Sequence, residues 1–139
     1  RANVIRKVDW PHLIKSELAV RQPVNGDVIY TAGCFLVAYS PKEKNRFTIS
    51  NQDGETFQSA SFSADGKYLA AGESAFSKPE ITIWGLEYQS DNKKVDTYTQ
   101  LKFLKGHKFG VEALKFSPDC RYLVSLGDVN DKGLFVWDW

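Results

Sequence analysis

Short apolar runs separated by turn residues recur along most of this chain. Between residues 24 and 139 the runs are five to seven residues long, and no apolar stripe at the helical spacing i, i+3, i+4, i+7 interrupts them. Turn-forming residues fill the intervals, as in SADGK at 63–67 and SPDCR at 117–121. We therefore expect an all-β chain. The predicted strands are 27–32, 34–40, 46–50, 57–63, 68–72, 80–84, 98–104, 111–117, 122–126 and 133–137.

The chain contains an internal repeat. FSADGKYL at 62–69 returns as FSPDCRYL at 116–123, and each copy continues into an apolar strand that ends in tryptophan, Trp84 or Trp137. The first copy is followed by the polar stretch GLEYQSDNKKVDT at 85–97 and then by another apolar run. Four antiparallel strands per unit, repeated along the chain, are typical of the blades of a β-propeller.

The repeat predicts the organisation of the whole chain. Residues 1–22 lead into the first blade, 23–50 form part of that blade, 51–105 form a second blade with a long loop at 85–97, and 106–139 form a third blade that lacks its outer strand. Propellers close with about four to eight blades. Three blades are therefore a propeller fragment, and the lack of any methionine also suggests an excerpt of a longer protein.

Composition narrows the classes of function. With 42% hydrophobic residues and a formal charge of +1, the chain can fill a core but has no strongly basic field, so nucleic acid is not an expected partner. No apolar stretch is long enough to span a membrane, and the first residues lack the apolar core of a signal peptide. Cys34 and Cys120 stand alone, without zinc-site spacing, and we interpret both as free thiols. We expect no metal, no cofactor and no membrane partner.

The blade motifs resemble the WD40 repeat family. Gly106-His107 opens the second copy, Phe-Ser-Pro-Asp follows, and Trp137-Asp138 closes it. Within that family, AGCFLVAYSPKEKN, FSADGKYLAAGES and GHKFGVEALKFSPDCRYLVSLG look like the amino-terminal propeller of the mitogen-activated protein kinase-binding protein 1 group, which includes a microcephaly-associated spindle-pole scaffold. Microtubule-associated and ciliary WD-repeat propellers share several of these pieces.

The resemblance implies a structural hydrogen-bond network in the third blade. In the family the histidine bridges an aspartate to a serine, and the serine reaches the tryptophan indole; here these residues are His107, Asp131, Ser125 and Trp137. The same three polar residue types also compose a hydrolytic triad, so a hydrolase is the enzymatic alternative. No Gly-x-Ser-x-Gly sequence surrounds Ser125, and we expect no catalytic residue.

The first copy of the repeat lacks the residues of this network. It has no histidine, and Lys78 stands six residues before Trp84 where Asp131 precedes Trp137. We therefore expect the second blade to depend on packing and the third blade to be more rigid. The packing residues would be Phe62, Tyr68, Leu69, Ile81, Ile83 and Trp84, each contributing roughly 1.5–3 kcal/mol when buried.

The loop before the third blade contains the candidate partner contacts, Lys105, Lys108 and Phe109. Solvated charges and an aromatic ring packed under the loop are the alternative. The resemblance implies a non-enzymatic, cytoplasmic protein-docking platform within a larger scaffold at the spindle pole or centrosome, or in kinase signalling. A microtubule-associated or ciliary and axonemal protein is the other candidate. The expected partners are other proteins, such as protein kinases or tubulin and microtubule proteins.

Overall fold

The structure is a computed structural model that describes residues 19–74, 78–90 and 94–139. The described residues form three antiparallel sheets. The first sheet has the order β1 (Ala19–Arg21), β2 (Val28–Ala32), β3 (Phe35–Ser40) and β4 (Asn45–Ser50). The second has the order β5 (Phe57–Phe62), β6 (Tyr68–Glu73), β7 (Glu80–Tyr88) and β8 (Val95–Lys105). The third is β9 (Val111–Phe116), β10 (Tyr122–Gly127) and β11 (Leu134–Asp138).

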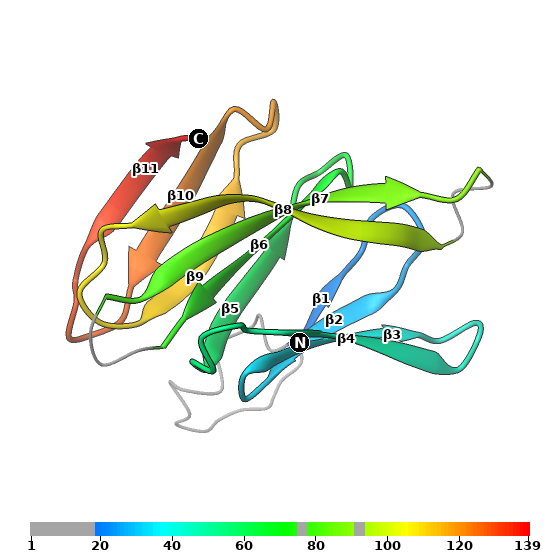
Figure 1. Cartoon of the computed structure of the whole chain (residues 1–139). Helices are drawn as coiled ribbons and strands as arrows, with labels where there is room; N and C mark the ends of the chain where they lie inside the picture. The colour runs from blue at the N-terminus through cyan, green and yellow to red at the C-terminus, as the bar shows by residue number, and fades with distance from the viewer. Residues whose placement is uncertain (1–18, 75–77, 91–93) are drawn as a thin grey trace, which may run out of the picture.

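The three sheets fan out side by side (Figure 1), and we call them the first, second and third blade. The inner strand β5 contacts β2 of the first blade and β9 of the third. A single bridge from Ser74 to Gly110 also joins the second blade to the third. The architecture predicted from the sequence, an all-β propeller fragment of about three blades with the last one incomplete, is confirmed.

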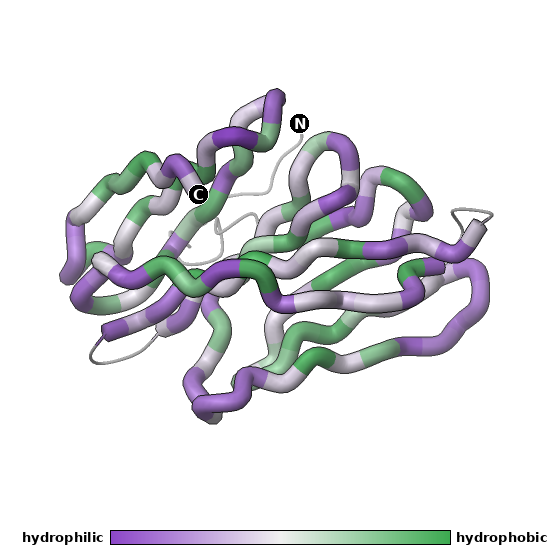
Figure 2. The backbone as a smooth tube through the Cα atoms, turned by 45° about the horizontal axis from the view of Figure 1, so that its top comes forward, coloured by the Kyte–Doolittle hydropathy of each residue, from purple (hydrophilic) through white to green (hydrophobic). Residues whose placement is uncertain are grey.

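Two apolar clusters fill the spaces between neighbouring blades. One joins the first and second blades around Leu36, Leu69 and Trp84, and the other joins the second and third around Ile83, Val111 and Leu123. Leu36, Leu69, Ile83, Val111 and Leu123 are fully buried. In Figure 2 the hydrophobic segments accordingly lie along the strands, and the hydrophilic segments lie mostly at the turns. Burial of one strand face against the next blade explains the alternation in the sequence.

The two repeat copies build the same turn. Ser63 donates to Asp65 (Oγ–Oδ1 2.6 Å), and the Tyr68 amide donates to Ser63 Oγ at 3.0 Å. In the second copy Ser117 donates to Asp119 at 2.6 Å, and the Tyr122 amide donates to Ser117 at 2.9 Å. The turn requires a left-handed residue, which is Gly66 (φ 75°) in one copy and Cys120 (φ 64°) in the other. The polar side chains of the repeat therefore define its backbone.

Two boundaries expected from the sequence are wrong. The first blade is a complete four-stranded sheet, because Ala19–Arg21 pairs with β2, whereas the sequence suggested a partial blade at 23–50 after a leading segment at 1–22. Residues 1–18 of that leading segment lie outside the described residues. A three-residue strand is too short to show alternation. The supposed loop at 85–97 is largely strand, since β7 continues to Tyr88 and β8 begins at Val95. Its many polar residues hid the pairing because β8 is mostly exposed.

Candidate functional site

The structure brings the four predicted network residues of the third blade together. His107 Nε2 lies 2.7 Å from Ser125 Oγ, and His107 Nδ1 lies 3.1 Å from Asp131 Oδ1. The indole of Trp137 donates to Ser125 Oγ at 2.7 Å. The His107 ring also packs edge-on against Phe135, with the centroids 4.6 Å apart. These contacts tie β10 and β11 to the loop before β9.

The chemistry of the end groups determines the direction of the hydrogen bonds. An indole N–H can only donate and a carboxylate can only accept, so the chain runs from Trp137 through Ser125 and His107 to Asp131. In the neutral imidazole, Nδ1–H then donates to Asp131 and Nε2 accepts from the Ser125 hydroxyl. Every donor in the chain has an acceptor. Ser125 has no exposed surface, and 1% of the His107 side chain is exposed, so this is an enclosed network.

Asp131 also holds the loop between β8 and β9. Its Oδ2 accepts from the backbone amides of Lys108 at 2.5 Å and Phe109 at 3.0 Å, and its Oδ1 accepts from the Gly133 amide at 2.9 Å. Burial raises the pKa of this carboxyl, but the bonds from Phe109, His107, Lys108 and Gly133 outweigh burial and hold the pKa well below its usual range. The network therefore fixes the loop that contains the predicted contact residues.

The three predicted contact residues are all accessible. Phe109 is 40% exposed, and Lys108 is exposed beside it. The Lys105 side chain, at the end of β8, is 69% exposed and forms an ion pair with Glu80 (Nζ–Oε2 3.2 Å). Phe109 is thus not packed under the loop, whereas Lys105 already has a carboxylate partner within the second blade.

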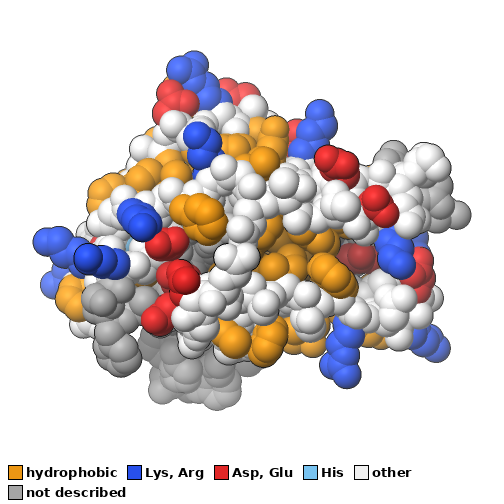
Figure 3. All heavy atoms as spheres, in the orientation of Figure 1, with side chains coloured by type: hydrophobic (Ala, Val, Ile, Leu, Met, Phe, Trp, Pro, Cys, Tyr) orange, Lys and Arg blue, Asp and Glu red, His pale blue; other side chains and the backbone are white. Residues whose placement is uncertain are grey.

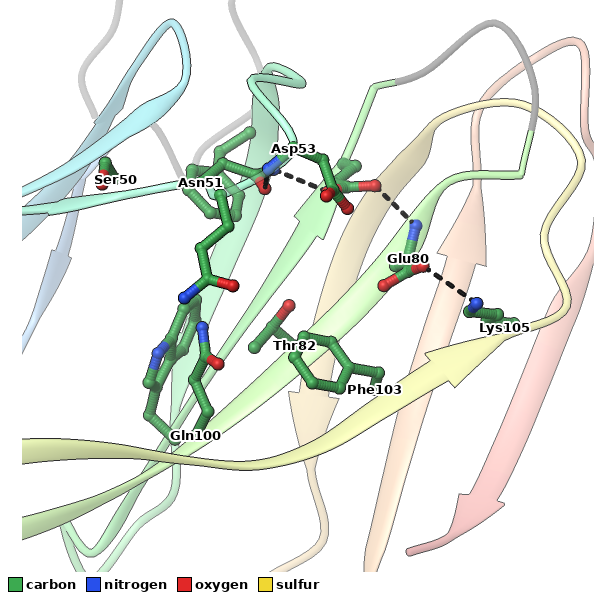
Figure 4. Close-up of a pocket in the computed structure, with 12 residues that line it drawn as sticks. Ser50, Asn51, Asp53, Glu80, Thr82, Gln100, Phe103 and Lys105 are labelled. Carbon is green, nitrogen blue, oxygen red and sulfur yellow. Dashed lines mark hydrogen bonds and ion pairs between the residues drawn. The ribbon is translucent and has the colours of Figure 1, made fainter.

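In the second blade, the buried carboxylate of Glu73 joins the loops at the ends of the strands. This role was not predicted from the sequence. Glu73, 4% exposed, accepts from Asn51 Nδ2 at 2.6 Å and from the Glu80 amide at 2.8 Å. Glu80 continues this chain to Lys105. Figure 4 shows the bonds running from the turn before β5, across the end of β6, to β7 and β8. The expectation that packing alone supports this blade was therefore incomplete. In the sequence, Glu73 directly follows the strand run YLAAG, where a charged residue is unexpected. This position is the sequence signal that could have identified Glu73 as a functional residue.

A pocket of about 220 Å³ lies beside this chain of hydrogen bonds. It opens between the turn before β5 and the strands β7 and β8 (Figure 4). Its lining is Ser50, Asn51, Gln52, Asp53, Phe57, Glu73, Glu80, Thr82, Trp84, Gln100, Phe103 and Lys105. The pocket therefore combines carboxylates and carboxamides with aromatic rings.

A larger groove of about 530 Å³ separates the outer strand of the first blade from the long β7–β8 hairpin. Phe47 of β4 stacks on Tyr98 of β8 there, with ring centroids 5.5 Å apart. Figure 3 shows apolar side chains inside this hollow and charged side chains along its sides. Burial raises the pKa of Tyr98, and the nearby Asp27 carboxylate raises it further. The groove exists because β7 and β8 continue past the body of the blade.

Neither the cysteines nor the histidine form a metal centre in the described part of the chain. There, no three His, Cys, Asp or Glu side chains meet as metal ligands would. Cys34 and Cys120 are free thiols. No helix within the described ranges has the length and apolarity needed to cross a membrane.

Comparison with known proteins places the third blade in a family. The sequence profile of a family described as "WD domain, G-beta repeat" matches residues 98–138. The match begins within β8 and ends with β11, so it contains most of the outer strand of the second blade and the three strands of the third. The chain is a WD40-repeat protein. The resemblance found in the sequence is confirmed.

Relatives of this WD40 protein include two mouse proteins and one human protein. WD repeat-containing protein 62 of Mus musculus is 38% identical over 89 residues, covering 64% of this chain and 5% of that protein. Mitogen-activated protein kinase-binding protein 1 of Mus musculus is 36% identical over the same length, with the same coverage. Cilia- and flagella-associated protein 52 of Homo sapiens is 33% identical over 119 residues, covering 83% of this chain and 17% of that protein. The chain thus spans only a small part of these relatives.

Solved structures of WD40 repeats share the fold. The crystal structure of RRP9 WD40 repeats superposes with a TM-score of 0.65 at 23% identity, covering 86% of this chain and 34% of that one. The structure of U3-55K gives the same TM-score and identity, covering 86% and 35%. WD40 domains mediate protein–protein interactions, and propellers of this type are generally non-enzymatic.

Proposed function

We propose that this WD40 protein is a non-enzymatic docking platform within a larger scaffold that acts at the spindle pole or centrosome, or in kinase signalling. The β8–β9 loop is the observation that supports this proposal. Asp131 binds the amides of Lys108 and Phe109, so the loop presents a half-exposed aromatic ring and a cation on a rigid base. Preordered aromatic and basic residues are frequent anchors of protein interfaces, because little entropy is lost on binding.

The burial of Ser125 favours a structural role for this residue over a catalytic role in hydrolysis. A nucleophilic serine must reach its substrate, whereas Ser125 is unexposed and accepts a bond from Trp137. A fluorophosphonate probe should leave Ser125 unmodified in the folded protein. Labelling that disappears in Ser125→Ala would establish the hydrolase instead.

A microtubule-associated or ciliary role is the second candidate. Cilia- and flagella-associated protein 52 matches 83% of this chain, a larger share than the 64% matched by WD repeat-containing protein 62. Exposed Lys108 and its neighbour Lys105 would then face acidic tubulin. We expect such binding to weaken steeply with salt, since exposed charges are screened.

Localisation in cells separates the two candidates. The tagged protein, expressed in dividing and in ciliated cells, should collect at spindle poles and stay there after microtubules are depolymerised. Axonemal localisation, or salt-sensitive co-sedimentation with purified microtubules, would favour the second candidate. Phe109→Ala should reduce the pole signal, whereas Phe35→Ala, at a ring of similar exposure (43% against 40%), should not. Equal signals for both variants would contradict docking through this loop.

A further inference from the structure

The pocket of the second blade occupies the place that the hydrogen-bond network fills in the third. Trp84 and Trp137 hold the same register, opposite Leu69 and Leu123. Two residues further along the same strands, Ala71 faces Thr82 in the second blade, and Ser125 faces Phe135 in the third. The second blade therefore lacks the serine hydroxyl, and a short threonine replaces the ring that packs on His107. An open pocket of about 220 Å³ remains there.

The polar groups of this pocket are not all satisfied from within. Trp84, 2% exposed, lines the pocket, and its indole N–H has no acceptor among the described residues. Its ring contact is with Phe57, at a centroid distance of 6.1 Å. The side-chain amides of Gln52 and Gln100 also lack hydrogen bonds within the described ranges. The pocket thus differs from the closed network of the third blade and retains capacity for a ligand.

The charge of the lining favours a cation. Three carboxylates, Asp53, Glu73 and Glu80, face one ammonium group, that of Lys105. The Glu73 carboxylate already accepts hydrogen bonds from Asn51 and the Glu80 amide, and the Glu80 carboxylate already forms an ion pair with Lys105. The Asp53 carboxylate has no partner in the described part of the chain. A positive group in the pocket would meet an excess of negative charge.

The shape and chemistry of the pocket favour a guanidinium group. A volume of about 220 Å³ is below the roughly 300–1,000 Å³ of typical small-molecule sites, so it suits one long side chain. Phe103 is 52% exposed on the wall and presents a face on which a planar cation can stack. The carboxamide oxygens of Gln52 and Gln100 each have two lone pairs, so one oxygen can accept from the Trp84 indole and from a guanidinium.

We propose that this pocket receives an arginine side chain of a partner protein. The proposal rests on the docking function and names a recognition element for it. Asp53 accepts from the guanidinium, Gln52 and Gln100 provide neutral acceptors, and Phe103 stacks on its plane. Lys105 then competes with the bound arginine for the Glu80 carboxylate and is not an anchor for the partner. Replacement of Lys105 should therefore strengthen arginine binding.

The four tryptophans of the chain provide a direct readout. The peptide Ac-Gly-Gly-Arg-Gly-Gly-NH2 is added to the ¹⁵N-labelled protein while the indole N–H signals are followed. The Trp84 signal should shift and saturate, and the Trp137 signal, fixed by Ser125, should stay in place. A citrulline peptide, which keeps the shape but loses the charge, should bind at least tenfold more weakly. The lysine peptide should also bind more weakly than arginine.

Matched variants test the assigned residues. Asp53→Asn should weaken the arginine peptide about tenfold. Asp96→Asn, the same change at an exposed carboxylate of the other groove, should leave the affinity within twofold. Lys105→Gln should raise the affinity. Unchanged folding of each variant is checked by the Trp137 indole signal.

Four outcomes would overturn the proposal: no shift of Trp84, equal binding of citrulline, preference for lysine, or equal effects of Asp53→Asn and Asp96→Asn. These outcomes leave the docking function untouched if Phe109→Ala still lowers the spindle-pole signal. Conversely, arginine binding at Trp84 without any effect of Phe109→Ala would contradict docking through the loop but not the pocket.

Discussion

The second and third blades share a register but secure their loops in different ways. The third blade uses Asp131, which accepts bonds from the His107 ring and from three backbone amides. The second uses Glu73, which accepts from one side chain and one amide. The same fold thus accommodates two arrangements, and in each a buried carboxylate accepts the hydrogen bonds that hold the loops. The Asp131 network fills the third blade, whereas the Glu73 arrangement leaves a pocket beside Trp84 in the second blade.

Removal of the two carboxylates should have the largest effect on this comparison. Asp131→Ala leaves three amides and an imidazole without their acceptor, and we expect a loss of about 4 kcal/mol of unfolding free energy. Glu73→Ala breaks two bonds and should cost about 2 kcal/mol. Hydrogen exchange of the amides of Lys108 and Glu80 reports the two blades separately. Glu87→Ala, at an exposed position of β7, is the control and should stay within about 0.5 kcal/mol.

The two left-handed turn positions should respond in opposite directions. A Cβ on Gly66 would lie 2.5 Å from Val24 Cγ2, and φ is 75°, so Gly66→Ala should cost about 2 kcal/mol or more. Cys120→Gly relieves a left-handed cysteine and should add about 0.5 kcal/mol, because relief of strain exceeds the gain in unfolded-state entropy. Chemical denaturation measures both. A destabilising Cys120→Gly would show that the thiol contributes packing that outweighs its strain.

The bond between Trp137 and Ser125 should appear as a coupling energy. In a double-mutant cycle of Trp137→Phe and Ser125→Ala, we expect about 1 kcal/mol of coupling. The same cycle with Trp84→Phe and Asp96→Asn should give none, since these residues are not in contact. Additive effects in the third blade would mean that the indole bond contributes nothing to stability.

A serine transplanted into the second blade should partly rebuild the network. Ala71→Ser places a hydroxyl where Ser125 stands in the third blade and gives the Trp84 indole an acceptor. We expect a gain of about 0.5 kcal/mol in the wild type and a loss in the Trp84→Phe background, where the hydroxyl is buried without its donor. Thermal unfolding of the four proteins checks this. A gain in both backgrounds would exclude the indole as the cause.

The third blade should lose stability at low pH and the second blade at high pH. The pKa of Asp131 is depressed on folding, so its stabilisation is complete above the unfolded value of about 3.9 and is lost as the pH falls through the lower folded pKa. In the second blade, burial raises the pKa of Tyr88 to about 12, so stability falls as the pH rises above about 10. Hydrogen exchange against pH should show acid loss at Lys108 and alkaline loss near Tyr88. Asp131→Asn should remove the first effect and Tyr88→Phe the second.

Local patterns were sufficient for most of the fold. Ten of the strands followed from alternation and turn residues, and their bounds shifted little except at β7 and β8. These two strands extend through polar residues, and only a few of the added positions, such as Leu86 and Val95, pack against the core, so the apolar period is too weak there to reveal a strand. Ala19–Arg21 was missed because three residues do not define a period.

The sequence by itself determined the repeat, most of the strands and the turn chemistry, because each depends on spacing within one copy, and its resemblance to the WD40 family implied the residues of the third-blade network. Only the tertiary structure decided that Glu73 meets Asn51, that Lys105 pairs with Glu80, and that a pocket opens beside Trp84. Each of these features needs loops from separate strands to converge. The distances between such loops follow from the packing of whole blades and leave no period in the chain.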